Sequence, residues 1–466
     1  MFAWGNSRLR VCGSVPYSSS SESSSGNTSS RSFLHWDVNR MSADVPSVST
    51  PDVMVSTFDS GSSLVERLAA AFSVKPEDQR ELQLHLQAAA PRPGTSNVTL
   101  QDAYEFVSQK LATVDLPVGA TGFRLRAAKD VINSGYATPE EKCMLLAAFA
   151  RALGQVSRSA HANPKPTTDV QIVFLTSRWV REEPVRPSML ERPLVVISDR
   201  KKQFALDPSL EVAPFAFIPP RFRGKSALSL TLADAGDYFV PHWIKLPLTL
   251  PFAAFQRVNT TASIDADGTL SAKVSYALRG DNEFLLRETF HQSPKEKWNE
   301  VAQLLALSDG FRGKITNVTA SDPYATRTPF TVEYEITQPK FVDWLKKPVR
   351  IPALLPQLGL PDPPAKPASA TATSPIDLGT PLNVETHLTL HLPAGTVART
   401  PAGTSIVRDY ATFASTYHIG PGPVTASRHL NFLSREIPAD RAADYNAFVR
   451  AVQNDESQEF TLEPPQ

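Results

Sequence analysis

The sequence has few cysteines, no long apolar run and no excess of charge of either sign. Its 466 residues contain only Cys12 and Cys143, too few for a disulfide framework or a cysteine-rich zinc site. No stretch of eighteen apolar residues occurs, so the sequence predicts no helix that spans a membrane. Lysine and arginine total 47, as do aspartate and glutamate, and this balance argues against a broadly basic nucleic-acid binder.

Glycine is scarce and proline is abundant, at 21 and 40 residues, which reverses their usual order. Helices do not tolerate so much proline, whereas turns, edge strands and linkers do. The length corresponds to about three domains. Together these observations predict a β-rich, multidomain protein with extended connections, and the apolar fraction of 41% is sufficient for packed cores.

The first part of the chain lacks the pattern of a folded domain. Residues 1–31 are predicted to be disordered, because the run from Ser18 to Ser30 is almost all serine and cannot bury enough apolar area to offset its ordering entropy. The pattern of a signal peptide is absent ahead of this run. Residues 32–57 contain one isolated strand pattern, whose sheet partners are not evident in the sequence.

Residues 58–250 show helical periodicity first and strand patterns afterwards, which is an α+β order. The sharpest helix signal begins at Thr138, an N-cap that is followed by Pro139 at the first helical position and by Glu141 in a capping box. Earlier helices are expected at 63–90 and 99–112. Later strands are expected at 170–176, 194–198 and 203–206.

Residues 251–466 alternate polar and apolar side chains and predict a C-terminal β-sandwich-like domain with appended helices. Strand patterns occur at 269–278, 330–337, 385–392, 412–419 and 425–434. Helical patterns occur at 294–307 and 440–452. Residues 361–375 are rich in proline and alanine and predict a semi-rigid linker.

The segment from Tyr104 to Gly154, with the later strand that ends in Ala205-Leu206-Asp207-Pro208-Ser209, resembles the transglutaminase-like domain of bacterial multidomain proteins. The resemblance covers roughly residues 55 to 245 and implies a papain-like α+β fold between two β-domains. It implies that 32–57 is the remnant of a preceding β-domain, most of which, with any signal peptide, is absent from this chain. It also implies a periplasmic or extracellular setting at the bacterial cell envelope.

The resemblance also implies where a catalytic triad would lie. The family motif Gly-Asp-Cys-Lys-Asp-Lys-Ala falls on the start of the helix after Thr138, where Lys142 matches and Pro139 takes the place of the nucleophilic cysteine. The family histidine falls on Arg192 or the residue after it, and only Asp207 matches its triad counterpart. Such a site needs a thiolate at the helix N-terminus, a histidine base and an orienting aspartate. Two of these three groups are therefore missing.

Cys143 is an alternative nucleophile, but it lies one helical turn beyond the usual position. There it would lack the unpaired N–H groups of the first turn, and Glu140 and Glu141 would disfavour its thiolate. The competing interpretation is a small buried core residue.

The other candidate residues have simple structural interpretations. Asp207 precedes a proline, and aspartate in this position commonly forms a turn at the end of a strand. His161 and His242 could face a cleft, although single histidines are usually structural or solvated. Neither a His-x-x-x-His pair nor a cluster of cysteine and histidine suggests a metal site, and no cofactor is expected.

We therefore expect an α+β protein with a catalytically inactive transglutaminase-like module that acts as a binding or scaffold protein of the bacterial cell envelope. The expected partner is an unidentified protein or peptide, and binding of nucleic acid is not expected. The alternative is a cysteine-dependent amide hydrolase or transferase that uses Cys143 and a histidine from a loop. In a third interpretation the module only spaces its β-neighbours. A reactive thiol of low pKa would favour the enzyme.

Overall fold

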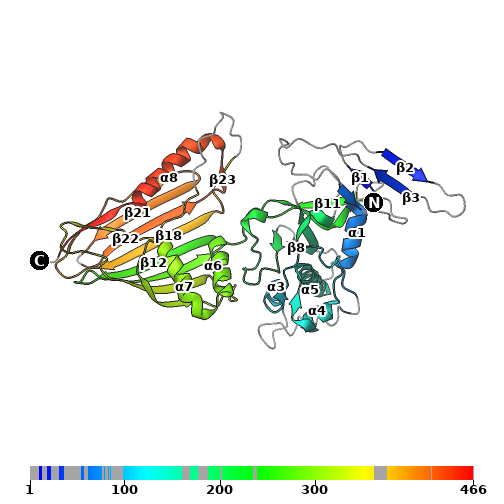
Figure 1. Cartoon of the computed structure of the whole chain (residues 1–466), viewed down its shortest axis with the longest axis horizontal. Helices are drawn as coiled ribbons and strands as arrows, with labels where there is room; N and C mark the ends of the chain where they lie inside the picture. Colours follow the sequence, from blue (N-terminus) through cyan, green and yellow to red (C-terminus); the bar gives the residue numbers. More distant parts are fainter. Residues whose placement is uncertain are drawn as a thin grey trace. The chain divides into compact units, whose positions relative to one another are not determined.

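The computed structural model describes residues 10–12, 18–22, 31–35, 54–56, 61–75, 78, 82, 84–85, 98–159, 168–176, 187–199, 202–234, 239–361, 375–420 and 422–464. The chain divides into two compact units, and each contains both helices and sheets (Figure 1). Unit 1 comprises Met1–Ser209 and Gly224–Leu246, and unit 2 comprises Leu210–Arg223 and Pro247–Gln466. The protein is thus of the mixed α+β class, as the sequence predicts.

Among the described residues, no helix is both long and apolar enough to cross a membrane. Most of the linker predicted at 361–375, namely 362–374, lies outside the described residues, as does His161.

Four short strands precede the helices of unit 1. β1 (Arg10–Cys12) pairs with β4 (Met54–Ser56), and β2 (Ser18–Glu22) pairs with β3 (Arg31–His35), both antiparallel. The serine-rich segment, predicted to be disordered, therefore contributes the strand β2, and the strand predicted to be isolated has a partner. The reason is that strand pairing uses backbone hydrogen bonds, which a run of serine can make as well as a run of apolar residues.

Unit 1 contains one antiparallel sheet of five strands in the order β11-β10-β7-β8-β9. The strands are β7 (Thr168–Thr176), β8 (Leu190–Asp199), β9 (Lys202–Leu206), β10 (Ser226–Asp234) and β11 (Phe239–Lys245). The long helix α5 (Pro139–Ser159) packs against β7 and β8, and α1 (Gly61–Ala71) packs against β10 and β11. Leu145, Leu146 and Phe149 of α5 are buried, as its periodicity predicts.

Smaller elements surround α5. The helix α3 (Leu100–Gln109) packs on α5, and the short helix α4 (Ala128–Ser134) precedes it. The two-residue strands β5 (Ala112–Thr113) and β6 (Tyr136–Ala137) pair in parallel. Because β6 ends immediately before Thr138, this pairing ties the start of α5 to the end of α3.

Unit 2 is built on a sheet of eight strands in the order β14-β15-β13-β12-β18-β22-β21-β20. The strands are β12 (Ala254–Ile264), β13 (Leu270–Arg279), β14 (Lys314–Ala320), β15 (Phe330–Gln338), β18 (Leu382–His391), β20 (Ser405–Val407), β21 (Ala411–Ile419) and β22 (Val424–Phe432). Neighbours are antiparallel except β12 and β18, which are parallel. The alternation of polar and apolar residues correctly predicts five of these strands, namely β13, β15, β18, β21 and β22.

Helices, rather than a second large sheet, cover the apolar face of this sheet (Figure 1). They are α6 (Asp281–Gln292), α7 (Trp298–Ser308) and α8 (Ala442–Glu456). The remaining strands form small sheets: β16 (Val349–Pro352), β24 (Glu459–Glu463) and β19 (Val397–Arg399), and the pair β17 (Ile376–Asp377) and β23 (Glu436–Ile437). This arrangement corrects the predicted β-sandwich. The helix α6 is not evident in the sequence, because its buried residues include Glu283 and Arg287, which a hydrophobic pattern assigns to the surface.

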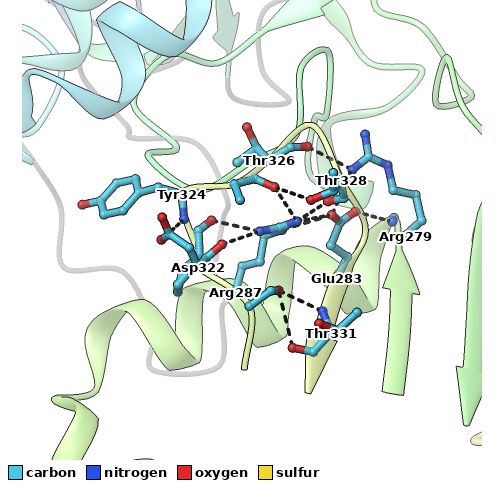
Figure 2. Close-up of polar contacts among 12 residues, drawn as sticks. Arg279, Glu283, Arg287, Asp322, Tyr324, Thr326, Thr328 and Thr331 are labelled. Atoms are coloured by element: carbon cyan, nitrogen blue, oxygen red, sulfur yellow. Dashed lines mark hydrogen bonds and ion pairs between the residues drawn. The ribbon is translucent and has the colours of Figure 1, made fainter. Parts of the chain in front are cut away.

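A buried cluster of charged residues joins α6 to the loop between β14 and β15 (Figure 2). Glu283 and Arg287 lie one turn apart on α6, and neither side chain has exposed surface. Arg279, at the end of β13, also donates to Glu283, at 3.1 Å. The two arginines donate to main-chain carbonyl oxygens of Asp322, Pro323, Ala325, Thr326 and Thr328. The conformation of this loop therefore depends on buried polar contacts.

Asp309, at the C-terminus of α7, accepts hydrogen bonds from two tyrosines of the sheet. Tyr276 of β13 donates to one carboxylate oxygen, and Tyr334 of β15 donates to the other at 2.6 Å. Burial raises the pKa of Asp309 to about 6, although both hydrogen bonds oppose the rise. Since the carboxyl pKa in the unfolded chain is about 4, the folded protein binds more protons than the unfolded chain between these values. Stability therefore falls as the pH rises through this range.

Replacing Asp309 by asparagine is expected to remove this pH-dependent destabilisation. Between about pH 4 and pH 7.5, the wild-type protein should lose about 3 kcal/mol of unfolding free energy relative to the variant. Urea unfolding of both proteins across this pH range, monitored by hydrogen exchange in α7, measures the difference in their unfolding free energies. A difference between the two proteins that stays constant with pH would contradict the expectation.

Candidate functional site

The helix α5 begins with the capping arrangement that the sequence predicts. The N–H of Glu141 donates to Thr138 Oγ1 at 3.3 Å, and the N–H of Thr138 donates to Glu141 Oε2 at 3.0 Å. Pro139 is the first residue of the helix, where its missing N–H leaves no helical bond unmade. The position that the resemblance gives to the nucleophilic cysteine is thus a buried proline with no reactive group.

The two glutamates of the first helical turn anchor the preceding segment. Arg126 Nε donates to Glu141 Oε1 at 2.8 Å, and Arg126 Nη2 donates to Glu141 Oε2 at 2.7 Å. Burial alone would raise the pKa of Glu141, but the hydrogen bonds from Arg126 and from the N–H of Thr138 lower it below its usual value. Glu140 accepts a hydrogen bond from the N–H of Gly119 at 3.0 Å. Both carboxylates are therefore engaged in holding the chain before α5.

Arg192 of β8 and Asp207, directly after β9, form an ion pair. Arg192 Nε lies 2.7 Å from Asp207 Oδ2, and the Asp207 side chain is only 1% exposed. The resemblance places a histidine near Arg192 and an aspartate at Asp207. These two positions are therefore in contact in the structure, with a guanidinium in place of an imidazole.

Ser209 occupies the other oxygen of the Asp207 carboxylate. Its N–H donates to Asp207 Oδ1 at 3.1 Å, and its hydroxyl donates to the same oxygen. The bond from the Ser209 N–H to the Asp207 side chain closes the turn that an aspartate before a proline predicts. Arg192 Nη2 also donates to the Ser209 hydroxyl, and Tyr104 donates to the main-chain oxygen of Asp207 at 3.3 Å. Both carboxylate oxygens of Asp207 are thus bound within the protein.

Cys143 lies in the second turn of α5, close to these charges, and its side chain is fully buried. Burial, followed by the negative charges of Asp207 and Glu140, raises the pKa of the Cys143 thiol well above its usual value. The positive charges of Arg192 and Lys142 oppose this rise without outweighing it. The thiol is therefore protonated at neutral pH and out of contact with solvent, which is unfavourable for a nucleophile.

Lys142, the residue that matches the family motif, is also completely buried. Its ammonium group donates to the main-chain oxygen of Ser108 at 3.0 Å and to Thr113 Oγ1 at 2.7 Å. Thr113 in turn donates to the main-chain oxygen of Ser209 at 3.3 Å. Lys142 thus links the end of α3 to the turn that carries Asp207, a connection that the sequence analysis missed.

The structure brings together Cys143, Arg192 and Asp207, with Pro139 one turn away on the same helix. His242 does not join them, because it lies on β11 and two strands, β10 and β7, separate β11 from β8. Ser209 and Tyr104 are members of the site that sequence reasoning did not identify. The position of Ser209, two residues after a matched aspartate, could have indicated it, whereas no local signal connects Tyr104 with Asp207, 103 positions away.

No group of three or more histidine, cysteine, aspartate or glutamate residues within the described part of the chain could hold a metal ion. The polar groups around Asp207 instead bond with one another. These bonds hold β8, β9 and α5 in a fixed geometry.

No family model and no curated protein matches this sequence. One solved structure that aligns with this chain is from Parabacteroides distasonis and is described as a "putative protease". The two chains are 12% identical, with a TM-score of 0.48, and the match covers 98% of this chain and 70% of the other. A likeness this distant transfers neither a fold assignment nor an activity.

Proposed function

We propose that unit 1 is a transglutaminase-like module of papain-like fold that lacks cysteine-dependent catalysis and acts as a binding or scaffold module of the bacterial cell envelope. The observation that carries this proposal is the contact of 2.7 Å between Arg192 and Asp207. A triad requires a base that can take a proton from the nucleophile. Arginine stays protonated at every physiological pH and cannot be that base.

The start of α5 supports the same proposal. A papain-like nucleophile needs the unpaired N–H groups and partial positive charge of a helix N-terminus. Here Thr138, Pro139 and Glu141 fill that place with a stable helix cap. The packing of α5 on an antiparallel sheet supports the papain-like scaffold, and the resemblance supplies the cell-envelope setting. A protein or peptide is the partner that such a module would bind.

The pH dependence of cysteine alkylation tests this proposal. In the folded Cys12→Ser protein, iodoacetamide should label Cys143 slowly at every pH up to about 9, because the thiol is buried and its pKa is raised. Labelling should become rapid only in urea, which serves as the control for an intact thiol. Rapid labelling of the folded protein below about pH 7 would instead favour the amide hydrolase or transferase that uses Cys143.

A second arm of the same experiment tests the scaffold. The variant Pro139→Cys, Arg192→His restores a cysteine and a histidine at the two unmatched positions. We expect its new thiol to be labelled at about pH 6 at least about tenfold faster than that of Pro139→Cys, Arg192→Gln. The glutamine variant is the matched control, because it removes the cation without supplying a base. Equal rates would contradict the papain-like placement of these positions.

A further inference from the structure

The segment 339–348, which connects β15 to β16 in unit 2, exposes a large apolar side chain almost completely. Leu345 is 92% exposed, the highest value among the large apolar side chains that the structure describes, and Val407 follows at 71%. An apolar side chain of this size gains free energy when a partner surface removes it from water. The segment has no part in the site around Asp207, which belongs to unit 1.

An anchored backbone holds Leu345 in this position. The N–H of Leu345 donates to Asp343 Oδ1 at 3.1 Å, and the N–H of Lys346 donates to the main-chain oxygen of Asp343 at 3.1 Å, so these residues form a hydrogen-bonded turn. Trp344 anchors the turn, because its ring packs against the apolar core and its indole N–H donates to the main-chain oxygen of Asp265 at 3.2 Å. Leu345 therefore projects into solvent from a turn that is tied to the sheet.

Lysines accompany Leu345 on this segment. Lys346 and Lys347 follow it directly, Lys340 precedes it, and all three residues are exposed. Asp343 is the acidic residue of the segment, and its carboxylate accepts the N–H of Leu345 and lies 4.0 Å from Lys346. The turn thus combines one projecting leucine with an excess of positive charge.

The neighbouring segments contribute charges of both signs. Arg312 and Lys314 are exposed beside the end of β15, where the N–H of Arg312 donates to Gln338 Oε1 at 3.0 Å. Asp265 and Asp267 oppose them from the turn between β12 and β13. These two basic and two acidic residues balance one another, so the positive excess of the segment 339–348 remains.

This combination fits an anionic lipid surface better than it fits a protein. Lysine is depleted at protein–protein interfaces, whereas it is favourable next to anionic headgroups. The long apolar stem of lysine also lets its ammonium group stay at the headgroups while a neighbouring side chain enters the apolar layer. A fluid bilayer closes around one projecting leucine, while a protein would need a cavity of matching shape.

We propose that the turn formed by residues 343–347 binds the surface of a bilayer that contains anionic phospholipids. Leu345 enters the boundary between headgroups and acyl chains, and Lys340, Lys346 and Lys347 contact lipid phosphates. With one apolar anchor and few cations, binding is reversible and weakens as salt screens the charges. The inference is independent of the function proposed for unit 1.

Co-sedimentation of the full chain with vesicles tests the proposal. With vesicles of phosphatidylglycerol and phosphatidylethanolamine in about 50 mM NaCl, we expect half of the protein to be bound at roughly 1 mM lipid. Vesicles of phosphatidylcholine, which carry no net charge, should bind at least about tenfold more weakly, as should anionic vesicles in about 500 mM NaCl. Equal binding to the two kinds of vesicle, or no binding to anionic vesicles at up to about 10 mM lipid, would overturn the proposal.

Variants of the turn test its two components. Leu345→Ser removes the apolar anchor and should weaken binding to anionic vesicles about 10- to 30-fold. Lys346→Gln with Lys347→Gln removes two cations and should weaken this binding by a similar factor, about 10 to 30. Unchanged binding by either variant would overturn the proposal, because it requires both the leucine and the lysines.

Matched controls change exposed residues elsewhere in unit 2. Leu304→Ser replaces a leucine of α7 that is 70% exposed, and Lys295→Gln with Lys297→Gln removes two exposed lysines between α6 and α7. Both controls should bind anionic vesicles as the wild-type protein does. If they weakened binding as much as the variants of the turn, total charge and exposed apolar area, rather than this turn, would account for binding and the proposal would be wrong.

Discussion

Replacing Arg428 by alanine is expected to lower the free energy of unfolding of unit 2 by about 3–5 kcal/mol. Arg428 of β22 lies 2.8 Å from Asp455 of α8, and the two side chains are 1% and 0% exposed. Asp455 also accepts hydrogen bonds from Tyr417, at 2.8 Å, and from Ser415. Without Arg428, only these neutral hydroxyls would compensate a buried carboxylate. Urea unfolding, with hydrogen exchange in α8 and β22, measures the loss.

Two further variants separate burial from charge pairing. Arg399→Ala breaks the pair between Arg399 and Glu463, whose side chains are 74% and 49% exposed, and should change stability by less than about 1 kcal/mol. Arg428→Met with Asp455→Leu removes both charges and should recover most of the loss. If Arg428→Ala lowered the unfolding free energy no more than Arg399→Ala, the expectation that the buried charge of Asp455 depends on Arg428 would be wrong.

Replacing Arg287 by alanine is expected to cost a similar amount, about 3–5 kcal/mol, and to release the loop between β14 and β15. The change leaves Glu283 buried, with Arg279 as its remaining cationic partner, at 3.1 Å. It also removes the donors to the carbonyl oxygens of Pro323, Ala325 and Thr328 (Figure 2). Limited proteolysis and hydrogen exchange of residues 321–329 should show faster cleavage and faster exchange than in the wild-type protein.

The variant Arg287→Lys separates the effect of the charge from that of the guanidinium geometry. A lysine keeps the charge but cannot reproduce the planar fork that reaches Glu283 and the loop together, so we expect it to recover less than half of the loss. Arg257→Ala removes an exposed arginine that pairs with Glu385 on the same sheet, and it should leave the loop protected. Full rescue by lysine would mean that charge alone, and not the geometry of the guanidinium, holds the loop.

These two predictions share a physical basis with the site in unit 1. Arg192, Arg223 and Arg428 each pair with a carboxylate of another segment, whereas Arg287 joins Glu283 of its own helix to carbonyl oxygens of the loop between β14 and β15. Pairs of this kind do not add much stability over apolar packing, but they tolerate few alternative arrangements. We infer that the guanidinium at Arg192 has the same positioning role in unit 1, which agrees with a scaffold that lacks a catalytic base.

Local sequence signals predicted the local structure well. The cap formed by Thr138 and Glu141 is present as predicted, because capping depends on residues three positions apart. The strands of unit 2 were predictable because one face of the sheet is apolar and the other is polar, which produces alternation. The turn at Asp207 followed in the same way from its neighbouring proline.

The helix α6 and the contents of the site could not be predicted from such signals. Hydrophobic periodicity assigns charged residues to the surface, whereas Glu283, Arg287 and Lys142 are fully buried with polar partners. The contact between Arg192 and Asp207 depends on the pairing of β8 with β9. The cysteine at position 143 was ambiguous, because its pKa depends on burial and on charges brought near it by other strands.

The sequence by itself therefore determined the α+β class, the start of α5 and most strands of unit 2, because each depends on neighbouring residues. It also determined that Pro139 cannot act as a nucleophile, which is a property of the residue alone. Only the tertiary structure decided that helices cover the large sheet, that Arg192 pairs with Asp207, and that Arg428 pairs with Asp455. These features join residues far apart in the chain, and their free energies depend on burial, which no local pattern contains.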